Sequence, residues 1–191
     1  MRMFLRKSTV GRDPLVIAMS GVRMGERLLQ IGVDDPAELG ALASKVGMSG
    51  HSAVTTLDDQ SAGRARAGVA EGAALADVTV THNGDLSYEA DTFDVVVVHG
   101  LNNLLASLST EVRMRLLSQL RYVTRPGGRV IVTEPGERSG LKAMFAPARK
   151  RDERYEQGGG TLAALQDAGF RPVRLLADRE GIRFIEGLKP A

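Results

Sequence analysis

The sequence contains no cysteine and no tryptophan, and only 4% of its 191 residues are aromatic. The absence of cysteine excludes disulfide bonds, zinc–thiolate centres and a cysteine nucleophile, and it agrees with a reducing compartment. A long basic block is also missing, and the net charge is only +2. Nucleic-acid-binding surfaces are usually more basic and carry interleaved aromatic residues. We therefore expect no nucleic acid among the partners of this protein.

Long hydrophobic runs are missing as well. Residues 1–7 have no apolar core of the kind that a secretion signal requires, and the apolar run of residues 15–19 is far too short to cross a bilayer. A content of 43% hydrophobic and 25% charged residues is typical of a globular protein. We expect a soluble, cytoplasmic protein with no integral membrane segment. Residues 1–191 are expected to form a single domain, with residues 1–24 as an N-terminal extension or helix.

Short apolar strands recur along the chain, separated by segments with helical spacing. The clearest are residues 93–98 and 129–133, two β-branched runs joined by an amphipathic helix and the break Arg125-Pro126-Gly127-Gly128. Unbroken apolar strands are typical of a parallel sheet that is covered on both faces. Further strands are predicted over residues 27–32, 53–57, 78–82, 170–176 and 182–187. The pattern predicts a three-layer α/β sandwich with a mostly parallel sheet.

The end of the chain differs from the rest, because the short turn Asp178-Arg179-Glu180-Gly181 lies between the last two predicted strands. A gap of this size is typical of an antiparallel hairpin. The helices have recognisable ends. Asp35, Pro36 and Glu38 have the residue types and spacing of a capping box. Ser109 or Thr110 is expected to cap a long amphipathic helix, and Thr161 is expected to open a short one.

Ligands of parallel sheets bind beyond the carboxyl ends of the strands, so the residues that follow each strand are the candidate site. An acid after the second strand is suited to the hydroxyls of a ribose, and one after the third strand is suited to an adenine amino group. Helix capping explains the first equally well, and turn formation explains the second. The candidates at these three strand ends are Gly32, Asp58, Asp59, Gly84, Asp85 and Leu86.

His99 ends the fourth strand and is the candidate catalytic group. It is suited to contact a ligand or to act as a base, and a purely structural role is equally open. The spacing of the three histidines suggests no metal site. Asn102 and Asn103, which follow His99, and Glu134, which follows the fifth strand, are candidate substrate-lining residues.

Residues 139–160 form a long segment of mixed charge that is expected to reach over the same edge of the sheet. One interpretation is a lid over the substrate, with contacts from Met144, Phe145 and Tyr155. The other is an ordinary surface loop.

Taken together, these segments resemble the class I S-adenosylmethionine-dependent methyltransferases. The match includes Gly84-Asp85-Leu86, Thr92-Phe93-Asp94-Val95-Val96, Arg125-Pro126-Gly127-Gly128-Arg129-Val130 and Asp167-Ala168-Gly169-Phe170, in the order found in that family. The stretch from His99 to Asn103 is most similar to the quinone-biosynthesis C-methyltransferases. The resemblance implies a Rossmann-like seven-stranded sheet of order 3-2-1-4-5-7-6, with the seventh strand antiparallel.

The resemblance also implies S-adenosylmethionine as cofactor and in-line methyl transfer to a small-molecule acceptor. Asp58, with Asp59 beside it, would hold the ribose, and Asp85 and Leu86 would hold the adenine. The methionine moiety and the sulfonium would lie against the first and fourth strand ends. The residues implied there are Gln30, Gly32, Val33, Asp34, His99 and Gly100.

The glycine loop departs from the pattern of the family at three positions. Gln30 stands where the family has an acid, and Asp34 and Pro36 stand where it has glycines. The Asp34 side chain would crowd the methionine moiety or would replace the missing acid. Two interpretations therefore stay open: a methyltransferase with a modified loop, and a protein of the same fold that has lost cofactor binding and acts as a partner-binding or regulatory module. A homo-oligomer or another protein partner also remains open.

Overall fold

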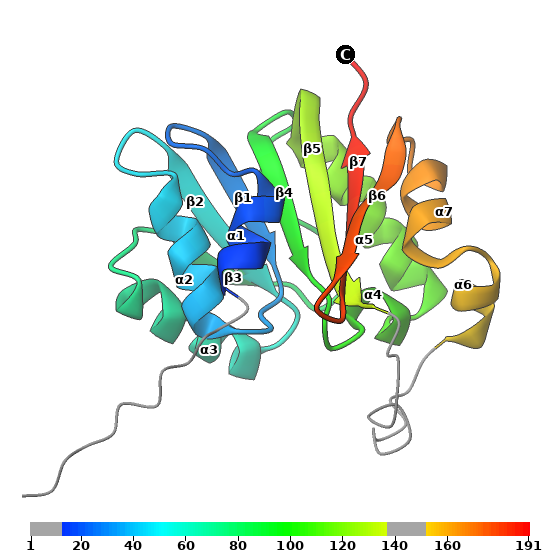
Figure 1. Ribbon diagram of the computed structural model, residues 1–191, viewed down its shortest axis with the longest axis horizontal. Coiled ribbons are helices and arrows are strands. Elements are labelled where there is room, and N and C mark those ends of the chain that lie inside the picture. The colour runs from blue at the N-terminus through cyan, green and yellow to red at the C-terminus, as the bar shows by residue number, and fades with distance from the viewer. Residues whose placement is uncertain (1–12, 137–151) are drawn as a thin grey trace, which may run out of the picture.

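The computed structural model describes residues 13–136 and 152–191, which form a twisted sheet flanked by helices (Figure 1). The sheet has seven strands in the order β3-β2-β1-β4-β5-β7-β6, which confirms the predicted order. The strands are β1 (Arg27–Ile31), β2 (His51–Thr56), β3 (Asp77–Val80), β4 (Phe93–His99), β5 (Thr124–Pro135), β6 (Val173–Arg179) and β7 (Ile182–Leu188).

Strands β1 to β5 are parallel to one another, and β7 is antiparallel to both β5 and β6. The predicted antiparallel hairpin is therefore confirmed, but its loop is shorter than the four residues expected. β6 continues to Arg179, so only Glu180 and Gly181 remain between the strands. Both have positive φ angles, 54° and 75°, as a two-residue turn with the right-handed twist of the strands requires.

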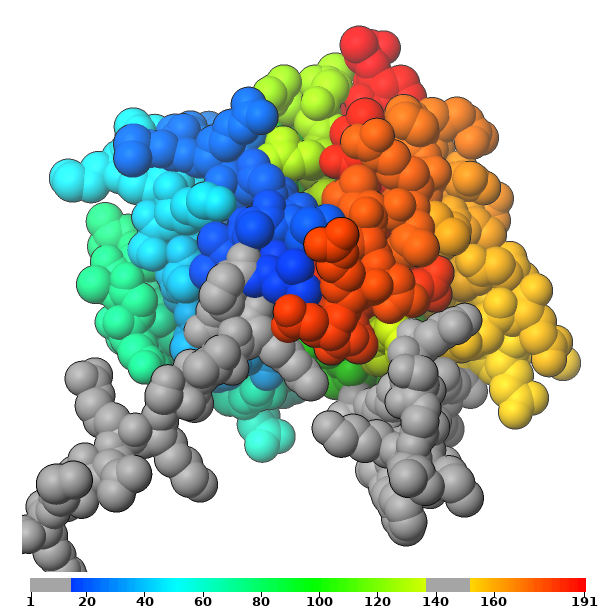
Figure 2. All heavy atoms as spheres, viewed as in Figure 1, coloured from blue at the N-terminus to red at the C-terminus, as the bar shows by residue number. Residues whose placement is uncertain are grey.

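The helices cover both faces of the sheet (Figure 1). One face carries α1 (Asp13–Ser20), α2 (Pro36–Lys45) and α3 (Asp59–Glu71). The other carries α5 (Thr110–Val123) and α7 (Gly160–Asp167), with the short α4 (Leu104–Ser107) and α6 (Glu153–Gln157) beside them. In Figure 2, α1 and the β6–β7 hairpin lie side by side on the near face, where Val16 of α1 and Phe184 of β7 belong to one apolar cluster.

The pleat of β4 explains why its apolar run is unbroken. Val95 and Val97 are buried in the cluster that includes α1 and α2, whereas Val96 and Val98 are buried in the cluster with α5 and α7. Successive side chains of a strand point to opposite faces, and both faces are covered here. The three-layer α/β sandwich predicted from the sequence is thus confirmed.

Two local predictions differ from the structure. Arg125 to Gly128, expected to be a break before the fifth strand, lie within β5 at a shift of register opposite Asp94. Glu38 was expected to complete the capping box of α2. Asp35 does accept hydrogen bonds from the amides of Ala37 and Glu38, but the Glu38 carboxylate is buried and lies next to His99. Burial against another strand end thus competes with the local cap.

None of the helices in the described part of the chain combines the length and the apolar character that crossing a membrane would require.

Candidate functional site

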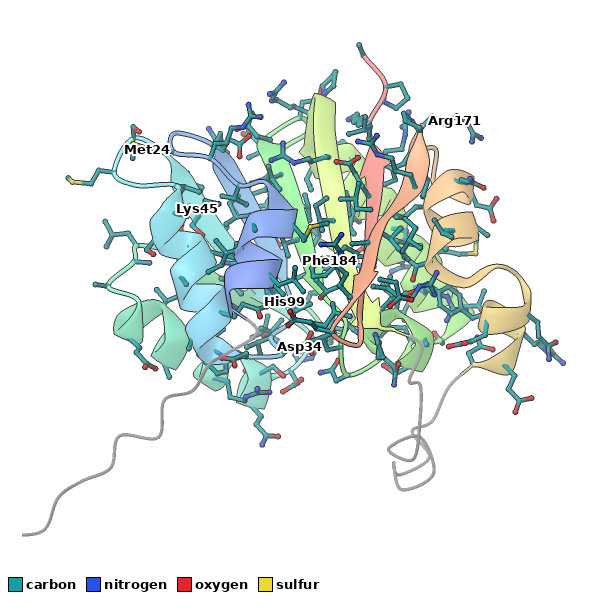
Figure 3. The ribbon with its side chains drawn as sticks, viewed as in Figure 1. Met24, Asp34, Lys45, His99, Arg171 and Phe184 are labelled. Carbon is teal, nitrogen blue, oxygen red and sulfur yellow. The ribbon has the colours of Figure 1, made fainter. Side chains whose placement is uncertain are left out.

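The carboxyl ends of the parallel strands meet at one edge of the sheet, the lower edge in Figure 1. The glycine loop follows β1 there, Asp58 follows β2, and His99 ends β4. Figure 3 shows Asp34 and His99 close to each other at this edge. The predicted site residues of the first and fourth strands are therefore brought together by the fold.

The glycine loop makes a tight turn against the end of β4. Gly32 has a φ of 75°, and a Cβ atom there would lie 3.2 Å from Leu104 Cδ2 and 3.3 Å from the carbonyl oxygen of His99. The backbone is held from the other side by Arg64 of α3. Its guanidinium donates to the carbonyl oxygens of Asp34, at 2.6 Å, and Val33, at 3.4 Å. The loop is thus fixed between α3 and the segment after β4.

The Asp34 side chain links the loop after β1 to the loop after β4. Its Oδ2 accepts a hydrogen bond from the backbone amide of Leu101 at 2.7 Å, and its Oδ1 accepts one from the amide of Asn102 at 3.2 Å. A carboxylate held by two amides is a charge-assisted pair, stronger than a neutral hydrogen bond. Asp34 therefore ties the two strand ends together through its own carboxylate.

Beneath this contact, Gln30, His99 and Glu38 form a buried polar group. The Gln30 amide nitrogen donates to the carbonyl oxygen of Leu39 at 3.1 Å, which leaves its Oε1 as the acceptor for His99 Nε2 at 2.9 Å. His99 Nδ1 lies 3.6 Å from Glu38 Oε1, beyond hydrogen-bond distance. The His99 ring is fully buried, so in this arrangement it joins β1, β4 and α2 and is not turned toward a ligand.

The acids predicted to bind the adenosine moiety are both exposed. Asp58 caps α3 by accepting hydrogen bonds from the Ser61 amide, at 2.7 Å, and from the Ser61 hydroxyl, at 2.8 Å. These bonds from Ser61 to the charged form, backbone first, lower the pKa of Asp58 below its usual value. A carboxylate has room for about four hydrogen bonds, so two sites remain for ribose hydroxyls. Asp59, the first residue of α3, is also exposed.

The turn after β3 rests on α5. Gly84 has a φ of 83°, and a Cβ there would lie 3.0 Å from the carbonyl oxygen of Val112. Asp85 accepts a hydrogen bond from the Asn83 side chain at 2.7 Å and lies 3.6 Å from Arg115, yet it stays half-exposed. The Leu86 side chain is buried in the core. Turn formation and ligand contact are therefore compatible at Asp85, as the sequence analysis left open.

On the other side of the β4–α4 loop lies a cavity of about 210 Å³. Its walls come from the ends of β4 and β5, from β7, and from α6 and α7. Six of the lining residues are Gly100, Asn103, Glu134, Tyr155, Thr161 and Arg183. Asn103 is only 7% exposed, and its side-chain nitrogen has no hydrogen-bond partner. Because buried donors are nearly always paired, this amide is a candidate ligand contact.

A chain of hydrogen bonds runs along one wall of this cavity. Thr161 donates its hydroxyl to Glu134 Oε2 at 2.6 Å, so its oxygen accepts from the Tyr155 hydroxyl at 2.9 Å. Arg183 pairs with Glu134 Oε1 at 2.8 Å. Burial raises the pKa of Tyr155 to about 12, so its phenol stays protonated at neutral pH. The wall therefore connects a phenol to a carboxylate through one hydroxyl.

Arg113 holds α6, and with it Tyr155, against the cavity. Although only 5% exposed, Arg113 donates to the carbonyl oxygens of Leu105 and Leu108, pairs with Asp152 at 2.9 Å, and lies 4.1 Å from the centre of the Tyr155 ring. These bonds satisfy a guanidinium that would otherwise be costly to bury.

Thr161, Arg183 and Arg113 were missed by the sequence analysis. Thr161 was assigned to capping, and the two arginines lie on elements with no candidate motif; a buried arginine in an apolar helical stripe leaves no signal beyond its position. Of the predicted substrate-lining residues, Asn103, Glu134 and Tyr155 line the same cavity, whereas Asn102 is exposed beside it. Met144, Phe145 and most of the predicted lid lie outside the described residues. Within residues 13–136 and 152–191, no group of three or more acidic or histidine side chains could hold a metal ion.

No protein-family model matches the sequence, and no curated protein matches it. Solved structures match it over most of its length. An S-adenosylmethionine-dependent methyltransferase from Aquifex aeolicus is 17% identical, with a TM-score of 0.71, over 93% of this chain and 89% of that one. The S-adenosylmethionine-dependent methyltransferase SibL is 22% identical, with a TM-score of 0.66, over 94% of this chain and 55% of that one.

The cyclase SpnF is 17% identical, with a TM-score of 0.64, over 94% of this chain and 80% of that one. Together with the strand order, these likenesses show that the protein has the class I S-adenosylmethionine-dependent methyltransferase fold. At such identities the likeness is to the fold alone, and one fold can carry several chemistries.

Proposed function

We propose that this protein transfers a methyl group from S-adenosylmethionine to a small-molecule acceptor. The observation that carries the proposal is the β4–α4 loop. The amides of Leu101 and Asn102 bind Asp34 beyond the ends of β1 and β4. Their neighbours Gly100 and Asn103 line the cavity. Methyl transfer needs a donor site that adjoins the acceptor site and opens to it, because the reacting atoms must approach to about 3 Å.

The residues present suit the adenosine half of the cofactor. Asp58 offers free carboxylate lone pairs for the ribose, and Asp85 is exposed for the adenine amino group. The methionine half requires Asp34 to leave the amides that it occupies in this structure. When bound, the cofactor supplies an electrophilic methyl group on a positively charged sulfur. The part of the protein is to orient the two reactants and to exclude water between them.

The cavity limits the size and chemistry of the acceptor. A cavity of roughly 150 Å³ can hold a benzene-sized molecule, so about 210 Å³ suits one substituted ring or a branched chain of similar size. The Asn103 amide nitrogen would donate to an oxygen of the acceptor. If an O–H or N–H group is methylated, Tyr155 would accept its proton while passing its own through Thr161 to the Glu134 carboxylate.

Calorimetric titration with S-adenosylmethionine and S-adenosylhomocysteine tests the donor site. Asp58→Asn keeps the helix cap but removes the charge, and we expect it to weaken binding by about tenfold, as the loss of a charged hydrogen bond would. Glu71→Gln is the matched control, because it removes an exposed carboxylate at the far end of the same helix. If neither ligand binds the unchanged protein or its variants, the proposal is wrong.

Transfer itself is tested by incubating the protein with S-adenosylmethionine carrying a labelled methyl group and a set of small hydroxylated and aminated rings. We expect labelled product from at least one acceptor, reduced at least about tenfold by Asn103→Asp, which replaces the unpaired donor by an acceptor of nearly the same size and tolerates the φ of 63° at this position. Binding of both cofactor forms without transfer to any acceptor of this size would contradict the proposed acceptor class.

A further inference from the structure

The proposed donor side of the site already contains a carboxylate of the protein itself, that of Asp34. Asp34 stands at a loop position where the related fold expects glycine, and both of its oxygens are bound by backbone amides 67 and 68 residues away in the chain. The Leu101 and Asn102 amides thus form a carboxylate subsite beyond the ends of β1 and β4, and Asp34 occupies it.

The surroundings favour this occupied state. Arg64 fixes the carbonyl oxygens of Val33 and Asp34, and it thereby holds the backbone from which the Asp34 side chain reaches the loop after β4. Leu104 packs against Gly32 from the same segment that carries the two amides. The loop is therefore held in place by the hydrogen bonds of Asp34 to the two amides and by the packing of Leu104 against Gly32.

We propose that Asp34 is an internal competitor of the cofactor, whose methionine carboxylate must displace the Asp34 carboxylate from the Leu101 and Asn102 amides. This inference rests on the proposed function and adds to it the control of the donor site. The exchange replaces one carboxylate by another on the same two donors, so no hydrogen bond is lost overall. What the ligand must overcome is the local concentration of the tethered carboxylate.

Competition by Asp34 is expected to weaken the binding only of ligands that carry an amino-acid group. S-adenosylhomocysteine carries a carboxylate that needs the subsite, whereas 5′-methylthioadenosine has the same adenosine thioether without it. If the closed state is favoured by the roughly 1.5–3 kcal/mol of a charged hydrogen bond, only about one molecule in ten to one in a hundred is open. Apparent affinity for S-adenosylhomocysteine falls by that fraction.

The test measures the affinities of both ligands for the unchanged protein and for Asp34→Gly, Asp34→Asn and Asp35→Asn. We expect Asp34→Gly to tighten S-adenosylhomocysteine about 10–100-fold and to change 5′-methylthioadenosine less than about twofold. Asp34→Asn, which keeps the size but loses the charge, is expected to fall between. Asp35→Asn removes the adjacent charge while keeping the cap of α2, and it should change neither affinity.

Amide hydrogen exchange gives a readout that does not depend on affinity. In Asp34→Gly, the amides of Leu101 and Asn102 should exchange faster than in the unchanged protein. S-adenosylhomocysteine should restore their protection, and 5′-methylthioadenosine should not. Equal affinity of S-adenosylhomocysteine for the unchanged protein and Asp34→Gly, with 5′-methylthioadenosine bound by both, would overturn the inference and leave the proposed function standing. Binding of neither ligand to any variant would overturn both.

Discussion

The two sides of the β4–α4 loop differ in how the polar groups next to the loop are bonded. On the side of β1, two loop amides bind Asp34, and Gln30 bonds to both Leu39 and His99, although His99 Nδ1 beneath them has no hydrogen-bond partner. In the cavity toward β5, Thr161, Tyr155 and Glu134 satisfy one another, but the buried Asn103 amide has no partner. On the first, closed side the loop amides are therefore occupied by the chain itself, whereas on the second, open side a buried donor is left at the cavity.

One fold can therefore hold the two halves of a site in different states. Buried polar groups are nearly always paired, and the chain itself or a ligand can supply the partner. Where the chain supplies the partner, a ligand has to compete for the group. Where the chain does not, ligand binding is favoured.

We expect the largest effect from Gly100→Ala, because Gly100 begins the β4–α4 loop that lies next to both sides. A Cβ there would lie 2.5 Å from the carbonyl oxygen of Thr133, so the backbone of β4 or β5 must shift. We expect a loss of about 3 kcal/mol in the free energy of unfolding, measured by urea denaturation.

Gly63→Ala is the matched control for that variant, because nothing lies within 4 Å of a Cβ on this exposed position of α3. It should stabilise the protein by up to about 1 kcal/mol, since alanine favours a helix over glycine. Equal effects of the two variants would contradict the close approach of Gly100 to β5.

Gln30→Leu tests the closed side. It removes the Gln30 amide to which His99 Nε2 and the Leu39 carbonyl oxygen are bonded in the core, and unsatisfied buried groups cost free energy. We expect a loss of about 2 kcal/mol in urea denaturation. The surface variant Gln60→Leu should change the same measurement by less than about 0.5 kcal/mol. A neutral Gln30→Leu would mean that the buried polar group does not hold β1 and β4 together.

Glu134→Gln tests the open side. Glutamine keeps an acceptor for Thr161 but loses the charge that pairs with Arg183 at 2.8 Å. For a half-buried pair we expect a loss of about 1 kcal/mol, and a double-mutant cycle with Arg183→Met should return a coupling of similar size. S-adenosylhomocysteine affinity should stay unchanged, because Glu134 lies on the acceptor side. A large change in that affinity would mean that the two sides are not separate.

The smallest expected effect is the loss, at acidic pH, of the stability that the charge of Asp58 contributes. Its pKa is lower in the folded protein, because Ser61 bonds to its charged form. The stability that the charge contributes is therefore fully present above the unfolded pKa of about 3.9 and is lost as the pH falls through the lower folded value. The stability difference between the unchanged protein and Asp58→Asn should be constant above about pH 5 and should shrink as the pH falls below the unfolded pKa. A difference that grows on acidification would contradict the assigned hydrogen bonds.

Periodicity and element ends were readable from the sequence because they are local. The valine run of β4, the Asp35 cap and the short spacing before β7 each reflect a rule that acts over a few residues, and the parallel sheet with its antiparallel strand followed from them. The length of the β6–β7 turn and the start of β5 could not be read, since strand pairing extends strands beyond their apolar residues.

The residues that follow each strand could be read from the sequence, because strand ends are set by local patterns. What these residues contact depended on the tertiary structure. The Asp34 carboxylate accepts from an amide 67 residues away, the Glu38 carboxylate lies buried 3.6 Å from His99 instead of completing the predicted capping box, and Thr161 donates to Glu134 instead of capping its helix. Packing at the sheet edge brings distant groups together, and desolvated donors and acceptors then pair with the partners within range.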